Sequence, residues 1–321
     1  MTLRVLLDTN IWAYVADDDA AAVLRQLARD HDLEVLISPA VVFEQLRMRD
    51  EERQKQHLDI TTRRWWTRLM PEAFVECEEL VAALGKHRPG WILNPPPPAA
   101  TKWFHQNRAD WLHGFWTRAR RFPTRQAGHN DTLGGETIVT ARTEVAAKKA
   151  FSRTSNVTLD TVSLTDPDVT NVELFDPANG RRFTTQYWRL GAATHFAHQL
   201  ARRGQSNTYR DWLDPFLDHR RTADQRAWMS FWMEVAPTEV PTQWLFWAAG
   251  VLVPLVKVND GSVFDVQLAA YMARADVFVT ADRNLARVAQ AMADAAPIPI
   301  ARPVRARPTS WTTTLAALGG G

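Results

Sequence analysis

Four acidic residues stand where they could share a metal ion. Asp8 follows a short apolar run near the N-terminus, and Asp282 follows a second such run near the other end of the chain. Glu44 lies in the segment Ser-Pro-Ala-Val-Val-Phe-Glu, and Asp265 lies in Val-Phe-Asp-Val-Gln-Leu. Carboxylate oxygens are the ligands that hard divalent cations such as Mg²⁺ prefer. If the fold brings the four acids together, we expect metal-assisted hydrolysis of a phosphodiester.

The segments around these acids predict alternating strands and helices. Short apolar runs rich in branched residues predict strands at residues 3–7, 34–37, 276–280 and 297–301, the last at a sheet edge. Periodic apolar positions predict helices at residues 20–29, from 38–39 onward, at 264–273 and at 283–293. This alternation is typical of an α/β domain with a parallel sheet. Ligands of such sheets lie at the carboxyl ends of the strands, where Asp8 and Asp282 are expected.

The middle of the chain differs from its ends. We assign residues 1–58 and 256–301 to the two parts of the α/β domain, and residues 59–255 to an insertion. The insertion is predicted to be mostly helical, and its ends are expected to contribute core helices. Alternation at residues 157–164 and 172–183, with an Asn-Gly turn, predicts a small β element within it. Residues 302–321 are predicted to form a C-terminal tail.

Composition narrows the class of protein. The chain has 321 residues, of which 45% are hydrophobic, and this is enough for a substantial core. Since no apolar stretch reaches the roughly 18 residues of a membrane span, we expect no membrane partner. The first strand follows without a charged leader, so we expect a cytoplasmic location. Cys77 is the single cysteine, which excludes an internal disulfide, and the net charge of +2 neither requires nor excludes nucleic acid.

The four acidic segments together resemble those of the PIN-domain nucleases, including the ribonuclease toxins of toxin–antitoxin pairs. The resemblance covers only about residues 3–50 and 258–301. It implies an α/β/α sandwich in which Asp8, Glu44, Asp265 and Asp282 bind one or two Mg²⁺ or Mn²⁺ ions and catalyse cleavage of RNA. It also implies an antitoxin or a second copy of the chain as candidate partners. DNA or a structured nucleic acid is the alternative substrate, and a module that binds nucleic acid or protein without cleavage is the alternative class.

Three further residues have candidate roles at this site. Asn10 and Thr280 are predicted to orient the carboxylates by hydrogen bonds, although ordinary turn and strand-end chemistry explains them equally well. Asp276 is a further candidate metal ligand, and its alternative role is that of a turn residue at the entry to a strand.

The acids themselves have structural alternatives. An aspartate that follows a strand is often the N-cap of the next helix, which applies to Asp8 and Asp282 and also to Asp265. Glu44 could be a solvated helix residue. These alternatives would leave the chain without a metal site.

Tryptophan and arginine in the insertion are candidates for contacts with nucleic acid, since aromatic rings stack on bases and arginine neutralises phosphates. The candidates are Arg63, Arg64, Trp65, Trp66, Arg118, Arg120 and Arg121. The alternative is that the tryptophans fill the core and the arginine stems cover it. His195 and His198 have a helical spacing, but no acidic pattern beside them supports a zinc site.

Overall fold

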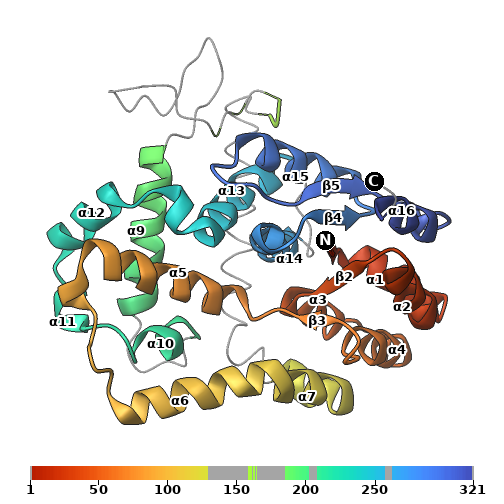
Figure 1. The fold of residues 1–321 in the computed structure, drawn as a ribbon, viewed down its shortest axis with the longest axis horizontal. Coiled ribbons are helices and arrows are strands. Elements are labelled where there is room, and N and C mark those ends of the chain that lie inside the picture. Colours follow the sequence, from red (N-terminus) through yellow and green to blue (C-terminus); the bar gives the residue numbers. More distant parts are fainter. Residues whose placement is uncertain are drawn as a thin grey trace.

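A parallel sheet lies at the centre of the fold. The computed structural model describes residues 2–128, 158–160, 162, 164, 185–201, 208–256 and 262–319. Its five strands pair in parallel in the order β3-β2-β1-β4-β5 (Figure 1). The strands are β1 (Leu3–Leu7), β2 (Leu33–Ile37), β3 (Thr67–Arg68), β4 (Val277–Thr280) and β5 (Arg302–Arg305). The predicted α/β class with a parallel sheet is confirmed.

The central strand is β1. Leu6 pairs with Leu36 of β2 on one side and with Phe278 of β4 on the other. The last three residues of β1 are 0% exposed, as expected of a parallel strand covered on both faces. The ladder continues past the strand, because the backbone N–H of Asp8 donates to the carbonyl oxygen of Val279 at 2.9 Å. The first residue after β1 is therefore held against the end of β4.

Local sequence signals set the starts of the N-terminal helices. These helices are α1 (Thr9–Asp17), α2 (Ala21–Asp30), α3 (Pro39–Gln45) and α4 (Glu51–Thr61). Pro39 takes the first position of α3, where its missing N–H costs no hydrogen bond. Asp50 caps α4, because its side chain accepts hydrogen bonds from two backbone N–H groups of the first turn. The predicted helix at 20–29 corresponds to α2, whereas α1 was not predicted.

The C-terminal region completes the sheet rather than forming a tail. Its elements are α13 (Pro241–Val256), α14 (Ser262–Ala269), the 3-10 helix η4 (Ala270–Arg274), α15 (Arg283–Ala295) and α16 (Trp311–Leu318). The tail predicted for residues 302–321 is wrong for residues 302–318, because β5 pairs with β4 and α16 packs against α2. Trp311 is only 3% exposed and anchors α16 in the core. The prediction of an edge strand at 297–301 is wrong in position, because these residues form no strand and the edge strand is β5 at 302–305.

The described part of the insertion is mostly helical, as predicted, and packs around α5 and α13. It comprises α5 (Glu72–His87), η1 (Pro89–Trp91), α6 (Pro98–Ala109), η2 (Asp110–Gly114), α7 (Phe115–Arg121), α9 (Thr185–Ala201), α10 (Thr208–Leu213), α11 (His219–Thr222), α12 (Gln225–Glu234) and η3 (Pro237–Glu239). α13 contacts α5 and α9 as well as α14 and α15, so it joins the insertion to the α/β region. β3 lies inside the range predicted as insertion. The predicted β element at 157–164 and 172–183 lies almost wholly outside the described residues.

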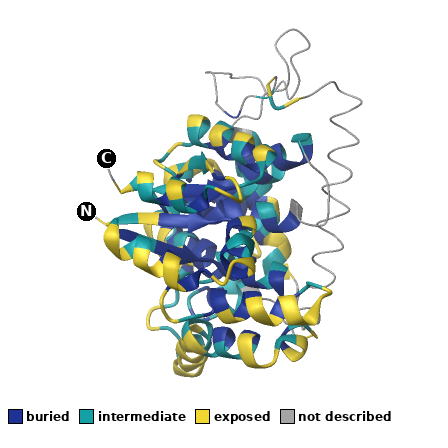
Figure 2. Ribbon diagram, turned by 90° about the vertical axis from the view of Figure 1, so that its right-hand side faces the viewer, coloured by how far each residue is buried: buried dark blue, intermediate teal, exposed yellow. Residues whose placement is uncertain are grey.

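Apolar side chains of both regions form one contiguous core, seen as the dark interior in Figure 2. Several tryptophans are fully buried in it, among them Trp12, Trp116, Trp188, Trp212 and Trp232. Most of the insertion's aromatic residues therefore serve packing, which was the alternative to nucleic-acid contact. Within the ranges that the structure describes, no helix is both long enough and apolar enough to span a bilayer.

Candidate functional site

The carboxyl ends of β1 and β4 form the position in the sheet where a ligand site is expected. The chain leaves β1 toward β2 on one side, and it leaves β4 toward β5 on the other. The two connections diverge at the β1–β4 pair. In open α/β sheets, such a switch point opens a crevice outside the carboxyl ends of the strands. Asp8 follows β1 directly, and Asp282 follows β4 two residues after its end.

Hydrogen bonds tie the two predicted acids to one hydroxyl group. The Thr280 hydroxyl donates to Oδ2 of Asp8 at 2.7 Å and accepts from the backbone N–H of Asp282 at 3.0 Å. Asn10 donates from Nδ2 to the same Asp8 oxygen at 3.1 Å. Thr280 is 0% exposed and Asp8 is 3% exposed, so these bonds are shielded from water. The contacts expected of Asn10 and Thr280 with the Asp8 carboxylate are present.

Asp282 has a structural role as well. Its Oδ1 accepts from the backbone N–H groups of Asn284 at 2.7 Å and Leu285 at 3.1 Å, which makes it the N-cap of α15. The cap fixes the orientation of the carboxylate at the edge of the sheet. A carboxylate has two oxygens, so capping and metal binding do not exclude each other. Asp8 precedes α1 but makes no side-chain cap.

Glu44 and Asp265 lie on two helices that pack against each other, α3 and α14. Both side chains are half-buried, and the Arg47 guanidinium on the α3 side lies 5.7 Å from the ring centre of Phe264 on α14. Among the described residues, however, no three His, Cys, Asp or Glu side chains are grouped so that they could hold a metal ion. The fold thus links Asp8 to Asp282 and packs α3 against α14, but it does not gather the acids into one ligand set.

Asp276 does not belong to this site. It lies before the first residue of β4, at the opposite edge of the sheet from Asp282. Its carboxylate accepts from Nη2 of Arg4 at 2.9 Å and from the Arg4 backbone N–H at 2.8 Å. These bonds lower the pKa of Asp276. The candidate role of Asp276 as a metal ligand is therefore wrong, and its position at the entry to the strand explains it.

The donor chemistry of the remaining acids fits a hard divalent cation. Asp8, Glu44, Asp265 and Asp282 offer only carboxylate oxygens, and neither sulfur nor imidazole is part of the set. Comparison with protein-family models, with curated proteins and with solved structures returns no match. The function of the site has to be inferred from the chain's own residues.

The two adjacent tryptophans of the predicted nucleic-acid set differ in their surroundings. Trp66 is 4% exposed, and its indole N–H donates to the carbonyl oxygen of Ile60 at 2.8 Å. Trp66 is therefore a core residue, and the prediction that it contacts nucleic acid is wrong because its ring is inaccessible. Trp65 is 41% exposed, and the guanidinium carbons of Arg25 and Arg63 lie 4.5 and 4.9 Å from its ring centre.

The predicted arginines also divide into paired and unpaired groups. Arg118 makes two hydrogen bonds to the carboxylate of Asp110, at 2.5 and 2.6 Å, and a third to Gln126. Because these bonds connect α7 to η2 and occupy the guanidinium, the geometry does not support the predicted role of Arg118 in nucleic-acid binding. Arg63 pairs with Asp59 at 2.8 Å. The other members of the set, Arg64, Arg120 and Arg121, are exposed.

A row of acids on α5, of which Glu76 is buried and the other two are half-buried, is absent from the predicted site. The acids are Glu72, Glu76 and Glu79, and their i, i+4, i+7 spacing on one helix face is the sequence signal that could have found them. Burial raises the pKa of Glu76 to about 8, although the Tyr209 hydroxyl donates to its Oε2 at 2.5 Å. Burial likewise raises the pKa of Glu79 to about 7, against the opposing effect of hydrogen bonds from Thr242.

Most side chains that face this row are polar and neutral, and the exception is Arg274, whose Nη2 lies 3.9 Å from Oε1 of Glu79. The Tyr271 hydroxyl donates to Glu72 at 2.9 Å, and the Gln267 amide donates to the same carboxylate at 3.1 Å. Nε2 of His195 lies 4.0 Å from Oε2 of Glu76. Burial, together with the smaller effect of the neighbouring His198 charge, lowers the pKa of His195 to about 4. Hydrogen bonds to the row connect α5 to neighbouring helices on both sides. We therefore interpret the row as a structural polar network.

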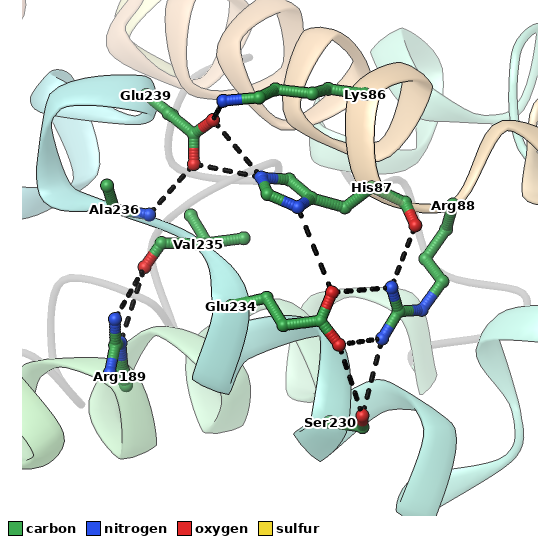
Figure 3. Close-up of polar contacts among 9 residues, drawn as sticks. All are labelled: Lys86, His87, Arg88, Arg189, Ser230, Glu234, Val235, Ala236 and Glu239. Carbon is green, nitrogen blue, oxygen red and sulfur yellow. Dashed lines mark hydrogen bonds and ion pairs between the residues drawn. The ribbon is translucent and has the colours of Figure 1, made fainter.

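Figure 3 shows a second polar cluster, where α5 meets the segment after α12. Glu239 accepts from Lys86, from His87 at 3.0 Å and from the backbone N–H of Ala236 at 2.8 Å. Burial opposes ionisation of Glu239, but these donors outweigh it and lower its pKa to about 2. Arg88 pairs in the same way with Glu234. Lys86 and Arg88 pair with Glu239 and Glu234, and Arg189 donates to the carbonyl oxygen of Val235, so the cluster holds helices together rather than forming a reactive site.

Proposed function

We propose that this chain is a metal-dependent endoribonuclease of the PIN type that hydrolyses phosphodiester bonds. One observation carries the proposal. The Thr280 hydroxyl joins the side chain of Asp8 to the backbone of Asp282 at the carboxyl edge of the two adjacent central strands. The order of the four acids along the chain and their strand or helix settings support it through the resemblance to PIN-domain nucleases.

The chain's own residues prepare the site for a substrate phosphate. Thr280 and Asn10 hold the Asp8 carboxylate in one orientation, and the α15 cap holds Asp282. Preorganised carboxylates avoid the cost of ordering them when a ligand arrives. Asp8 and Asp282 would hold Mg²⁺ or Mn²⁺, which would supply Lewis acidity and lower the pKa of bound water. The resemblance assigns Glu44 and Asp265 of the packed helices to the same ion, although the four acids do not form one ligand group in this structure.

The test is cleavage of labelled single-stranded RNA and DNA by the purified chain. We expect RNA cleavage with Mg²⁺ or Mn²⁺ that chelation by EDTA stops. Asp8→Asn and Asp282→Asn remove one charge each while keeping the hydrogen-bonding shape, and asparagine retains the α15 cap. We expect each change to lower cleavage by about a hundredfold or more, because loss of the groups that merely orient metal ligands already costs about 10- to 100-fold. Calorimetric titration with Mn²⁺ should show weaker binding in both variants.

Asp276→Asn is the matched control. It removes the same charge from the same strand region but at the opposite sheet edge, where Arg4 is the partner. We expect cleavage and Mn²⁺ binding to match those of the unmodified chain. Activity that survives both Asp8→Asn and Asp282→Asn, or activity lost equally in Asp276→Asn, would overturn the proposed site. Cleavage of DNA but not RNA would transfer the proposal to the alternative substrate.

A second candidate function is a module that binds nucleic acid without cleaving it. The observation favouring it is that no three acidic or histidine side chains are grouped for an ion among the described residues. Binding of RNA with no cleavage in any divalent metal would support this candidate. The resemblance also suggests an antitoxin protein or a second copy of the chain as a partner, which co-purification and light scattering would detect.

A further inference from the structure

Three arginines meet where α7 contacts the edge of the sheet. Arg68 is the last residue of β3, and its guanidinium carbon lies 5.2 Å from the ring centre of Trp116 on α7. Arg68 also donates from Nη2 to the carbonyl oxygen of Thr62 at 2.6 Å. Arg120 is one helical turn beyond Trp116, on the same side of α7. Arg64 lies in the loop between Thr62 and β3.

No acidic side chain neutralises this group. Within the described ranges, neither Arg64, Arg68 nor Arg120 has an ion-pair partner, and Nε of Arg68 is buried without a hydrogen-bond acceptor. Burial lowers the pKa of Arg68, and the charges of Arg64 and Arg120 lower it further, so each of these two charges is near enough to repel the Arg68 guanidinium. A bound anion would relieve both the repulsion and the unmet donor.

The group lies at the same edge of the sheet as the acids. Arg68 pairs with Ile37 at the carboxyl end of β2, and Leu36 is level with Leu6 near the carboxyl end of β1. Neighbouring strands are about 4.8 Å apart, so β3 lies about 10 Å from β1. A strand of nucleic acid that reaches Asp8 can therefore also reach this cluster. The cluster includes α7, so it is built partly by the insertion (Figure 1).

We propose that Arg64 and Arg120, supported by Arg68, bind a phosphate of a nucleic-acid strand whose neighbouring phosphate lies at the Asp8–Asp282 edge. The inference deepens the proposed function, and the identity of its ligand as nucleic acid rests on it. Arginine is suited to this role because its planar fork of N–H groups matches phosphate oxygens. The exposed Trp65, next to Arg64 in the chain, adds an aromatic surface of the kind that single-strand binders use.

The test measures binding separately from cleavage. Fluorescence anisotropy of a labelled single-stranded RNA is recorded in EDTA over a range of salt concentrations, with the variant Arg64→Gln/Arg120→Gln. Each neutralised phosphate on a single strand contributes about 0.7 to the slope of log K against log salt, so loss of this one phosphate site should lower the slope by about 0.7. At about 0.1 M salt this corresponds to binding about 5-fold weaker. Arg68 is kept, because it also holds α7 in place.

The control is Arg226→Gln/Arg302→Gln, which removes the same charge from exposed positions on α12 and at the start of β5. We expect its slope and affinity to match those of the unmodified chain, and circular dichroism should show the same melting temperature for both double variants. An unchanged slope in Arg64→Gln/Arg120→Gln would overturn the inference. The inference would also be overturned if polyaspartate displaced RNA as readily as polyphosphate does. The cluster would then bind acidic protein.

Failure of this inference and failure of the proposed function give different results. RNA binding with the expected loss of slope, but no cleavage in Mg²⁺ or Mn²⁺, supports the phosphate site and removes the nuclease. Metal-dependent cleavage with the same KM in Arg64→Gln/Arg120→Gln supports the nuclease and removes the phosphate site.

Discussion

Burial of Glu76 predicts that the protein loses stability as the pH rises. Glu76 is 0% exposed on α5, and burial raises its pKa from 4.5 to about 8 even though Tyr209 donates a hydrogen bond to it. The unfolded chain releases this proton near pH 4.5, whereas the folded chain keeps it up to about pH 8. In that interval the folded state binds more protons than the unfolded state. The contribution of Glu76 to stability is therefore greatest below pH 4.5 and falls until about pH 8.

The magnitude follows from the two pKa values. One pKa unit corresponds to about 1.4 kcal/mol, and integration from about pH 5 to about pH 8 gives a loss of about 3 kcal/mol from Glu76. Glu79, with a pKa of about 7, acts in the same direction. His195 acts in the opposite direction, because its pKa is lowered from 6.5 to about 4 and its contribution is lost as the pH falls through that range. Comparing variants at each pH isolates the effect of Glu76.

The assay is urea-induced unfolding followed by tryptophan fluorescence between about pH 5 and about pH 8, for the unmodified chain and Glu76→Gln. The glutamine carbonyl still accepts from Tyr209, but the side chain no longer titrates. We expect the free energy of unfolding of Glu76→Gln, relative to that of the unmodified chain, to rise by about 3 kcal/mol across this range. Glu51→Gln, at an exposed position of α4, is the control. Its free energy of unfolding should differ from that of the unmodified chain by the same amount at every pH. Parallel pH profiles for Glu76→Gln and the unmodified chain would refute the reasoning.

Three further changes test packing and hydrogen bonding by urea or thermal unfolding. Thr280→Val removes the buried hydroxyl between Asp8 and Asp282 and should lower the free energy of unfolding by about 2–4 kcal/mol. Thr280→Ser keeps the hydroxyl and should be about as stable as the unmodified chain. Equal stability of the two variants would contradict the role of this hydrogen-bond network. Asp282→Ala should lower the free energy of unfolding by about 1 kcal/mol, because it removes the α15 cap. Asp282→Asn keeps a capping side chain and should change stability little. A large loss of stability in both variants would indicate a role beyond capping. Trp66→Ala should cost about 3–5 kcal/mol because its ring is buried, whereas the exposed Trp65→Ala should cost less than about 1 kcal/mol. A reversed order would contradict their assignment to core and surface.

Parts of the fold that depend on local pattern could be predicted from the sequence. Continuous apolar runs identified β1, β2 and β4, because a parallel strand buried on both faces needs apolar residues at every position. Asp8 and Asp282 could be assigned to one sheet edge, since parallel strands end on the same side. Thr280 and Asn10 could be named as their supports because they lie within two residues of these acids.

Features that depend on distant neighbours could not be predicted. β3 contains only Thr67 and Arg68, so no apolar run marks it, and it forms because β2 offers a free edge. Trp65 and Trp66 are adjacent and chemically identical, yet only Trp66 meets the core. The pKa of Glu76 likewise depends on burial between helices far apart in the chain.

The sequence by itself determined the positions of β1, β2 and β4, most of the helices beside them, and which acids stand at the ends of β1 and β4. These properties follow from the period of apolar side chains and from steric rules along a short stretch of backbone. Only the tertiary structure decided that Asp276 faces Arg4 at the opposite edge, and that Arg68 and Arg120 meet across the junction with the insertion. The physical reason is that burial, charge pairing and hydrogen bonding depend on groups that packing brings together from separate parts of the chain.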